Sequence, residues 1–121
     1  MNNKIGIYGI YNARSGDLLY VGQTRAGFSK RWSSHMSEFK KKGNTKSKKL
    51  YSRMKRGVEV EFREIFVIPK NPDSEQYKRI LDIEQYFITK LRPLANSQRK
   101  RLTKSQIQEI EKLIGKKSTK S

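Results

Sequence analysis

A single glutamate stands on what should be the buried face of a helix. Glu84 lies one turn from both Ile80 and Ile88, in a stretch whose apolar residues recur at helical spacing. Burying an unpaired carboxylate is unfavourable in free energy. The position therefore predicts one of two things. The carboxylate either reaches solvent or one of the many lysines and arginines at the edge of the apolar stripe, or it binds a metal ion in a cleft.

Two further residues that could take part in chemistry lie four positions apart nearer the N-terminus. Arg31 and His35 project from the same side of a predicted helix, next to an apolar stripe of Trp32, Met36 and Phe39. For such a pair, spacing alone favours a solvated basic face over a functional site.

The N-terminal stretch KIGIYGIYNARSGDLLYVGQT, residues 4–24, carries two tyrosines on two apolar runs. Alternation and turn residues predict a β-hairpin, with strands at Lys4–Asn12 and Leu18–Gly22 joined by a turn at Asn12–Asp17. Such a hairpin would present Tyr8 and Tyr20 side by side.

Helical spacing, capping residues and chain breakers predict the remaining elements. They are a helix from its N-cap Ser29 to about Lys41, a short helix over residues 47–56, a strand at Val58–Val67, a helix at Glu75–Leu91 capped by Ser74, and a last helix opened by the capping box Thr103–Gln106. With the hairpin, the order is strand, strand, helix, helix, strand, helix, followed by a helical C-terminal segment.

Composition limits the class of protein. A chain of 121 residues allows one domain with a modest core, and a net charge of +17 predicts a polyanionic partner, nucleic acid first. No cysteine and one histidine exclude a disulfide framework, thiol chemistry and a zinc site, so any metal would have oxygen ligands. Without a signal peptide or a membrane-spanning run, we expect a cytoplasmic protein of a bacterial or phage-infected cell that binds no membrane. The sequence does not determine the oligomeric state, for which we favour a monomer.

Several short motifs follow one another along the chain. They are Gly6-Ile7-Tyr8, Tyr20-Val21-Gly22, Lys30-Arg31-Trp32 with His35, Glu84 within a helix, and Asn96 just beyond that helix. Each is weak alone, but in this order they resemble the GIY-YIG nuclease superfamily, which includes phage homing endonucleases. The resemblance covers residues 4–96, and its one departure is Val21 in place of an isoleucine.

The resemblance implies an α+β fold in which helices flank a small three-stranded antiparallel sheet, in agreement with the predicted order of elements. A nuclease domain would occupy residues 1–97, and residues 98–121 would form a short basic C-terminal helix and tail. The implied activity is metal-dependent endonucleolytic hydrolysis of DNA, double-stranded or branched. The biological role stays open between a homing-type nuclease of a phage or mobile element, a repair or recombination enzyme, and part of a defence system.

By this resemblance the catalytic residues have distinct roles. Tyr8 would be the general base or would orient the attacking water, supported by Tyr20, and its pKa would have to be lowered by Arg31 and a metal ion. Arg31 would also hold the scissile phosphate, while His35 would donate a hydrogen bond or relay a proton.

Metal binding and support of the site are implied in the same way. Glu84 would hold one Mg²⁺ or Mn²⁺, and Asn96 would fix the arrangement as a hydrogen-bond donor. Gly22 would allow close approach of the backbone, and Gly6 serves either the motif or simple strand packing.

DNA affinity is expected to come from basic residues near the site and in the C-terminal segment. They are Lys30, Arg99, Lys100, Arg101 and Lys104. The C-terminal helix could equally dock on the core through Ile107, Ile110 and Leu113, and the two roles are compatible. Charge alone is also consistent with a different class, a basic nucleic-acid-binding protein without catalysis, which would not need the motif residues together.

Overall fold

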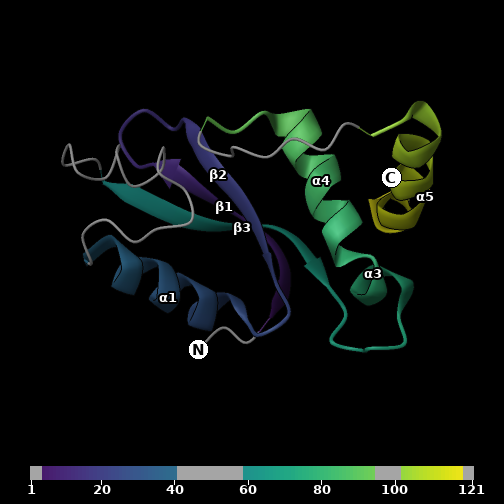
Figure 1. Cartoon of the computed structure of the whole chain (residues 1–121), viewed down its shortest axis with the longest axis horizontal. Helices are drawn as coiled ribbons and strands as arrows, with labels where there is room; N and C mark the ends of the chain where they lie inside the picture. Colours follow the sequence, from purple (N-terminus) through teal and green to yellow (C-terminus); the bar gives the residue numbers. More distant parts are fainter. Residues whose placement is uncertain (1–3, 41–58, 95–101, 119–121) are drawn as a thin grey trace.

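A computed structural model describes residues 4–40, 59–94 and 102–118 of the chain. In chain order these ranges contain β1 (Ile5–Asn12), β2 (Leu18–Thr24), α1 (Phe28–Lys40), β3 (Val60–Ile68), α3 (Glu75–Lys78), α4 (Ile80–Leu91) and α5 (Lys104–Ser118) (Figure 1). The short helix predicted over residues 47–56 lies outside the described residues. Among the helices of the described ranges, none has the length and apolarity needed to cross a membrane.

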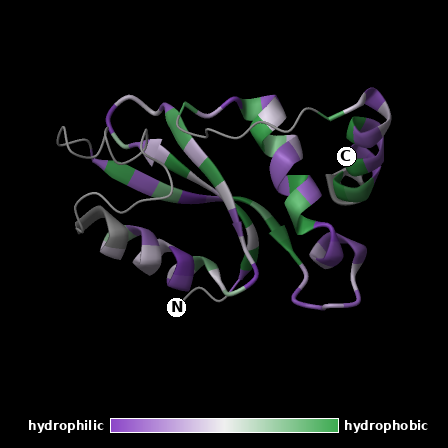
Figure 2. Cartoon of the chain, viewed as in Figure 1, coloured by the Kyte–Doolittle hydropathy of each residue, from purple (hydrophilic) through white to green (hydrophobic). Residues whose placement is uncertain are grey.

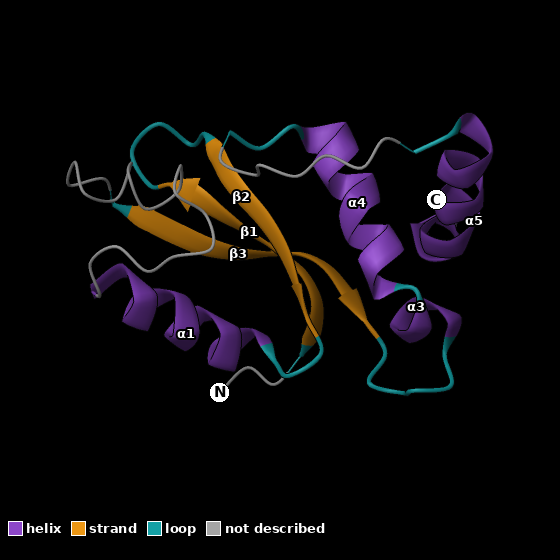
Figure 3. Cartoon of the chain, in the orientation of Figure 1, coloured by secondary structure: helices purple, strands orange, loops and turns teal. Residues whose placement is uncertain are grey.

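The fold is α+β, as predicted, with one antiparallel sheet of three strands in the order β2-β1-β3 (Figure 3). The central strand β1 pairs with the neighbouring β2 of the hairpin and with the distant β3. Helix α1 lies on one side of the sheet and α4 on the other, with α5 outside α4 (Figure 1). The sheet thus separates two helices, α1 and α4, that are far apart in sequence and lie on its opposite faces.

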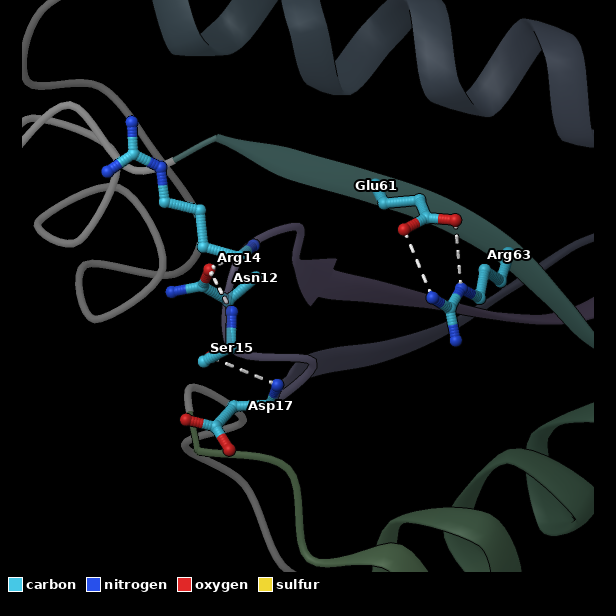
Figure 4. Close-up of polar contacts among 6 residues, drawn as sticks. All are labelled: Asn12, Arg14, Ser15, Asp17, Glu61 and Arg63. Carbon is cyan, nitrogen blue, oxygen red and sulfur yellow. Dashed lines mark hydrogen bonds and ion pairs between the residues drawn. The ribbon is translucent and has the colours of Figure 1, made fainter.

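The hairpin turn is fixed by short polar contacts within it. The Asn12 side-chain oxygen accepts hydrogen bonds from the backbone N–H groups of Arg14 and Ser15, at 2.8 and 3.1 Å. The Ser15 hydroxyl accepts one from the backbone N–H of Asp17 (Figure 4). This Asx-type geometry is why the polar stretch reverses the chain here.

Alternation along β1 divides the core into two parts. Ile5 and Ile7 pack against α4, whereas Tyr8 and Ile10 lie on the face of the sheet that α1 covers. Successive strand residues point to opposite faces, so a single strand supplies both layers. Hydrophobic residues accordingly recur along the strands and along α4 (Figure 2).

The helix predicted at Glu75–Leu91 is in fact two helices, so that prediction is wrong. Arg79 interrupts it with φ −106° and ψ 27°, between α3 and α4. In a continuous helix the Tyr77 carbonyl would accept the N–H of Leu81. Instead it accepts two hydrogen bonds from the Arg25 guanidinium, at 3.0 and 3.3 Å. This long-range contact leaves no local sequence signal.

The start and stripe of α1 also differ from the prediction. The helix begins at Phe28, so Ser29 lies in its first turn rather than at the N-cap. Phe28 is fully buried and His35 is 4% exposed, whereas Met36 is 42% exposed. The inner face of α1 therefore includes the histidine and excludes the methionine.

At the C-terminal end the predicted capping box is present. Thr103 accepts the N–H of Gln106 through its hydroxyl at 3.1 Å, and the Gln106 side chain accepts the N–H of Thr103 at 2.9 Å. The helix that follows, α5, packs against α4 and α3 and inserts Ile110, 1% exposed, into the core. Docking on the core is thus a role of this segment.

Candidate active site

The Tyr8 hydroxyl is the centre of a buried polar cluster. Tyr8 is fully buried on the α1 side of the sheet. Arg31 donates a hydrogen bond from Nε to the Tyr8 oxygen at 3.1 Å, and Nε2 of His35 lies 2.7 Å from the same oxygen. The i,i+4 spacing on α1 is what brings both side chains to one atom.

The Tyr8 oxygen accepts the Arg31 N–H and shares a second hydrogen bond with Nε2 of His35, whose direction depends on the tautomer of the imidazole. In the tautomer that carries its ring proton on Nδ1, the Tyr8 hydroxyl donates to Nε2. The three groups form a short chain along which a proton could move.

Gly22 makes room for the tyrosine of the facing strand. It is the direct cross-strand partner of Tyr8. A Cβ at this position would collide with the Tyr8 hydroxyl and lie 2.5 Å from Cζ of its ring. The glycine of the second motif is thus required by the side chain of the first, a closer cause than the backbone approach expected from the sequence.

Gly6 is required by the backbone. Its φ is +145°, and a Cβ there would collide with the Phe66 carbonyl of β3. The pairing of β1 with β3 shifts register just beyond it, between Ile7 and Tyr8. Gly6 therefore serves the close strand packing that was one of its two expected roles.

Tyr20 lies next to the cluster, as the hairpin predicted. Its ring centroid is 6.4 Å from that of Tyr8 and 5.5 Å from that of His35. Phe62 of β3 contacts the other side of the imidazole, with the ring centroids 6.3 Å apart. The sequence contained no sign that Phe62 contacts the histidine, since that contact joins residues 27 positions apart.

Glu84 approaches the cluster from α4. It is half-buried, and burial raises the pKa of its carboxyl from the usual 4.5 to about 7, with the Arg31 cation acting in the opposite direction. Its charge also reaches Tyr8. The structure thus brings together Tyr8, Tyr20, Arg31, His35 and Glu84, which the sequence had grouped only by motif order.

Arg31 does not by itself lower the pKa of Tyr8 below its usual value. Burial raises the pKa of the Tyr8 phenol above its usual value, and the neighbouring Tyr20 adds to this, while Arg31 only partly offsets them. The lowering by Arg31 that a phenolate base would need is outweighed because desolvation of the anion is the larger effect. Without a bound metal ion, Tyr8 is a neutral phenol.

A divalent ion is compatible with this site. No cluster of three or more histidine, aspartate or glutamate side chains able to hold a metal occurs within residues 4–37, 59–94 and 102–115. Mg²⁺, however, is commonly held by one or two carboxylates, with water and substrate phosphates completing its shell. The half-buried Glu84 carboxylate, within electrostatic range of the Arg31 cation, fits that arrangement.

The other candidate residues are more scattered. Lys30 is exposed on α1, and Lys104 is exposed at the start of α5. Asn96 lies outside the described residues, as do Arg99, Lys100 and Arg101.

Comparison with known proteins agrees with this geometry. Residues 4–101 match the GIY-YIG catalytic domain, a nuclease-type fold. The match spans most of the 121 residues, and the chain belongs to the GIY-YIG family. GIY-YIG domains are generally endonucleases and typically depend on a divalent metal ion. No curated protein and no solved structure matches the chain.

Proposed function

We propose that this protein is a divalent-metal-dependent endonuclease that hydrolyses phosphodiester bonds in DNA. The observation that carries the proposal is the buried Tyr8 hydroxyl, held between Arg31 and His35 with Glu84 within electrostatic range. Family membership and the net charge of +17 support a DNA substrate.

In the proposed reaction, water attacks the phosphorus in line with the departing 3′ oxygen. The water gives its proton to the Tyr8 oxygen while the Tyr8 hydroxyl proton moves to Nε2 of His35. The phenol ends neutral and the imidazole becomes a cation. The bond between phosphorus and the 3′ oxygen breaks, and that oxygen takes a proton from solvent. This relay suits a raised tyrosine pKa because no free phenolate forms.

The remaining residues bind and orient. Arg31, whose Nε holds the Tyr8 oxygen, would bind the phosphate through its terminal nitrogens. Tyr20 would support Tyr8, and Asn96 would fix the site as a donor. Glu84 would hold one Mg²⁺ or Mn²⁺, which when bound supplies Lewis-acid stabilisation of charge on the phosphate and the leaving oxygen.

The test is nicking of supercoiled plasmid with Mg²⁺ or with a chelator. The wild-type chain is expected to cleave only with the metal.

Glu84→Gln should abolish cleavage and leave DNA affinity unchanged or slightly higher, because it removes a metal ligand and a negative charge. Glu75→Gln, which changes an exposed carboxylate on α3, is the matched control. Full cleavage by Glu84→Gln would refute Glu84 as the ligand. DNA binding without cleavage by wild type would favour the non-catalytic class.

We extend the proposal to a homing-type role in a phage or mobile element, on the basis of the motif resemblance. Such a role requires a preferred double-stranded site. Mapping the cut positions in a random-sequence DNA library should then recover one extended sequence. Cuts spread evenly over the library, or confined to branched substrates, would contradict it.

A further inference from the structure

Helix α4, which carries Glu84, has no side-chain cap at its N-terminus and ends at a non-glycine residue in the left-handed conformation. Its N-cap Arg79 makes no side-chain capping hydrogen bond. Its C-cap Arg92 adopts the left-handed conformation, with φ 51°, that normally favours glycine. A 12-residue helix with such ends gains little stability by itself, so its position depends on tertiary contacts.

Helix α5 supplies those contacts from the side away from the sheet. Ile110 is buried with residues of the α4 core face. Glu109 and Glu111 precede and follow Ile110 in the sequence, so they project about 100° from it, in opposite directions, around the axis of α5. Glu109 reaches Nη2 of Arg79 at 3.4 Å. Glu111 accepts a hydrogen bond from the Tyr86 hydroxyl at 3.0 Å.

The two contacts fall on either side of Glu84 along α4. One is at Arg79, where α4 begins, and the other is at Tyr86 and Lys90, whose ammonium lies 3.9 Å from Glu111. Tyr86 follows Glu84 by two residues and so points to nearly the opposite side of the helix. Contacts with α5 at both of these places hold one side of α4, and the opposite side, which carries Glu84, is then fixed in position.

We propose that α5 clamps α4 in the position that lets Glu84 bind a metal ion, with Glu109 and Glu111 as positioning residues. The inference rests on the proposed role of Glu84. It gives these two acidic residues of a chain with net charge +17 a role in positioning Glu84 rather than in contact with DNA.

The test uses the full chain and a pair of matched double variants. Glu109→Ala/Glu111→Ala removes the clamp. Glu59→Ala/Glu61→Ala makes the same change of net charge at two exposed carboxylates that pair with arginines away from α4. Binding of Mn²⁺ to each chain is followed by electron paramagnetic resonance, with Glu84→Gln as the baseline. The Mg²⁺ concentration for half-maximal plasmid nicking and DNA affinity without metal are measured alongside.

The clamp variant should weaken Mn²⁺ binding and raise the half-maximal Mg²⁺ concentration by about tenfold, because two contacts, each with an effect of about two- to fivefold, are lost together. Its metal-free DNA affinity should match that of the control pair. Equal metal dependence of the two double variants would overturn the inference, as would a loss confined to DNA affinity.

Two further measurements separate the alternatives. If the double variant does not fold, Tyr86→Phe removes only the hydrogen bond to Glu111, and a two- to fivefold weakening of Mn²⁺ binding is expected for about 0.5–1 kcal/mol. No weakening in a folded Tyr86→Phe chain would refute the clamp. A wild type that binds Mn²⁺ through Glu84 without nicking DNA would refute the proposed function, while the Mn²⁺ comparison would still decide the clamp.

Discussion

The Tyr8 phenol is buried and neutral, yet it contacts both an arginine and a histidine. Tyr8→Phe keeps the ring and its packing but removes the oxygen that passes a proton from water to His35 in the proposed reaction. We expect a loss in kcat of about 10²- to 10⁴-fold with the fold intact. Tyr11→Phe is the matched control, because Tyr11 lies on the same strand with its ring under Arg63 on the other face.

The pH profile distinguishes a relay from a phenolate base. Because burial raises the pKa of Tyr8, the relay predicts a rate that is nearly flat between pH 8 and about 9. A rate that keeps rising about tenfold per pH unit over that range would indicate a phenolate instead. Unchanged cleavage by Tyr8→Phe would leave Tyr8 as a packing residue only.

Glu84 links the active site to stability. Its pKa is about 7 in the folded chain and usually 4.5, so between these values the folded state holds a proton that the unfolded state has lost. Without metal, wild-type stability should therefore fall as pH rises from about 4.5 to 7, by on the order of 2–3 kcal/mol from this group. Glu84→Gln has no carboxyl to titrate, so its stability does not fall in this way. The Tm of the variant minus that of wild type should therefore increase from about pH 4.5 to 7 and then level off. A constant difference would contradict the raised pKa.

Among the elements, the hairpin is the one whose geometry the site needs most directly. Gly22→Ala would place a Cβ against the Tyr8 ring, which is fully buried. We expect a stability loss of about 1–3 kcal/mol and at least a tenfold loss in kcat, because the hydroxyl must leave Arg31 and His35.

Gly16→Ala in the hairpin turn serves as the control for Gly22→Ala. Gly16 has φ +82° and open space around it, so alanine there strains the backbone by about 1–2 kcal/mol without touching the site. Equal activity in the two variants at equal folded fraction would show that Gly22 affects stability alone.

For the whole molecule, charge should govern DNA affinity. Replacing the basic cluster of the C-terminal segment by alanine is expected to weaken binding and to reduce the slope of log K against log salt by about 0.9 for each DNA phosphate that the variant no longer neutralises. The cluster is Arg99, Lys100, Arg101 and Lys104. An unchanged slope in a folded variant would leave only the docking role of this segment.

Arg63→Ala is the control for the basic cluster. Its guanidinium is exposed but already donates two hydrogen bonds of 3.1 Å to Glu61 (Figure 4). A cation neutralised in this way releases few counterions on binding DNA. The salt slope of Arg63→Ala should therefore stay close to that of wild type.

The sequence by itself determined the features that depend on local spacing. Alternation and turn residues are local, and they placed the hairpin and both tyrosines correctly. Reciprocal hydrogen bonds over three residues are local too, and they identified the capping box at Thr103. The order of the motifs was sufficient to assign the GIY-YIG family.

Only the tertiary structure decided what depends on contacts between distant segments. Arg25 reaches the Tyr77 carbonyl 52 residues away and ends a helix that local spacing predicted to continue. Burial under α1 raises the Tyr8 pKa where adjacent charges alone suggested that it would fall. Desolvation and long-range hydrogen bonds depend on everything packed around a group, so no pattern along the chain contains them.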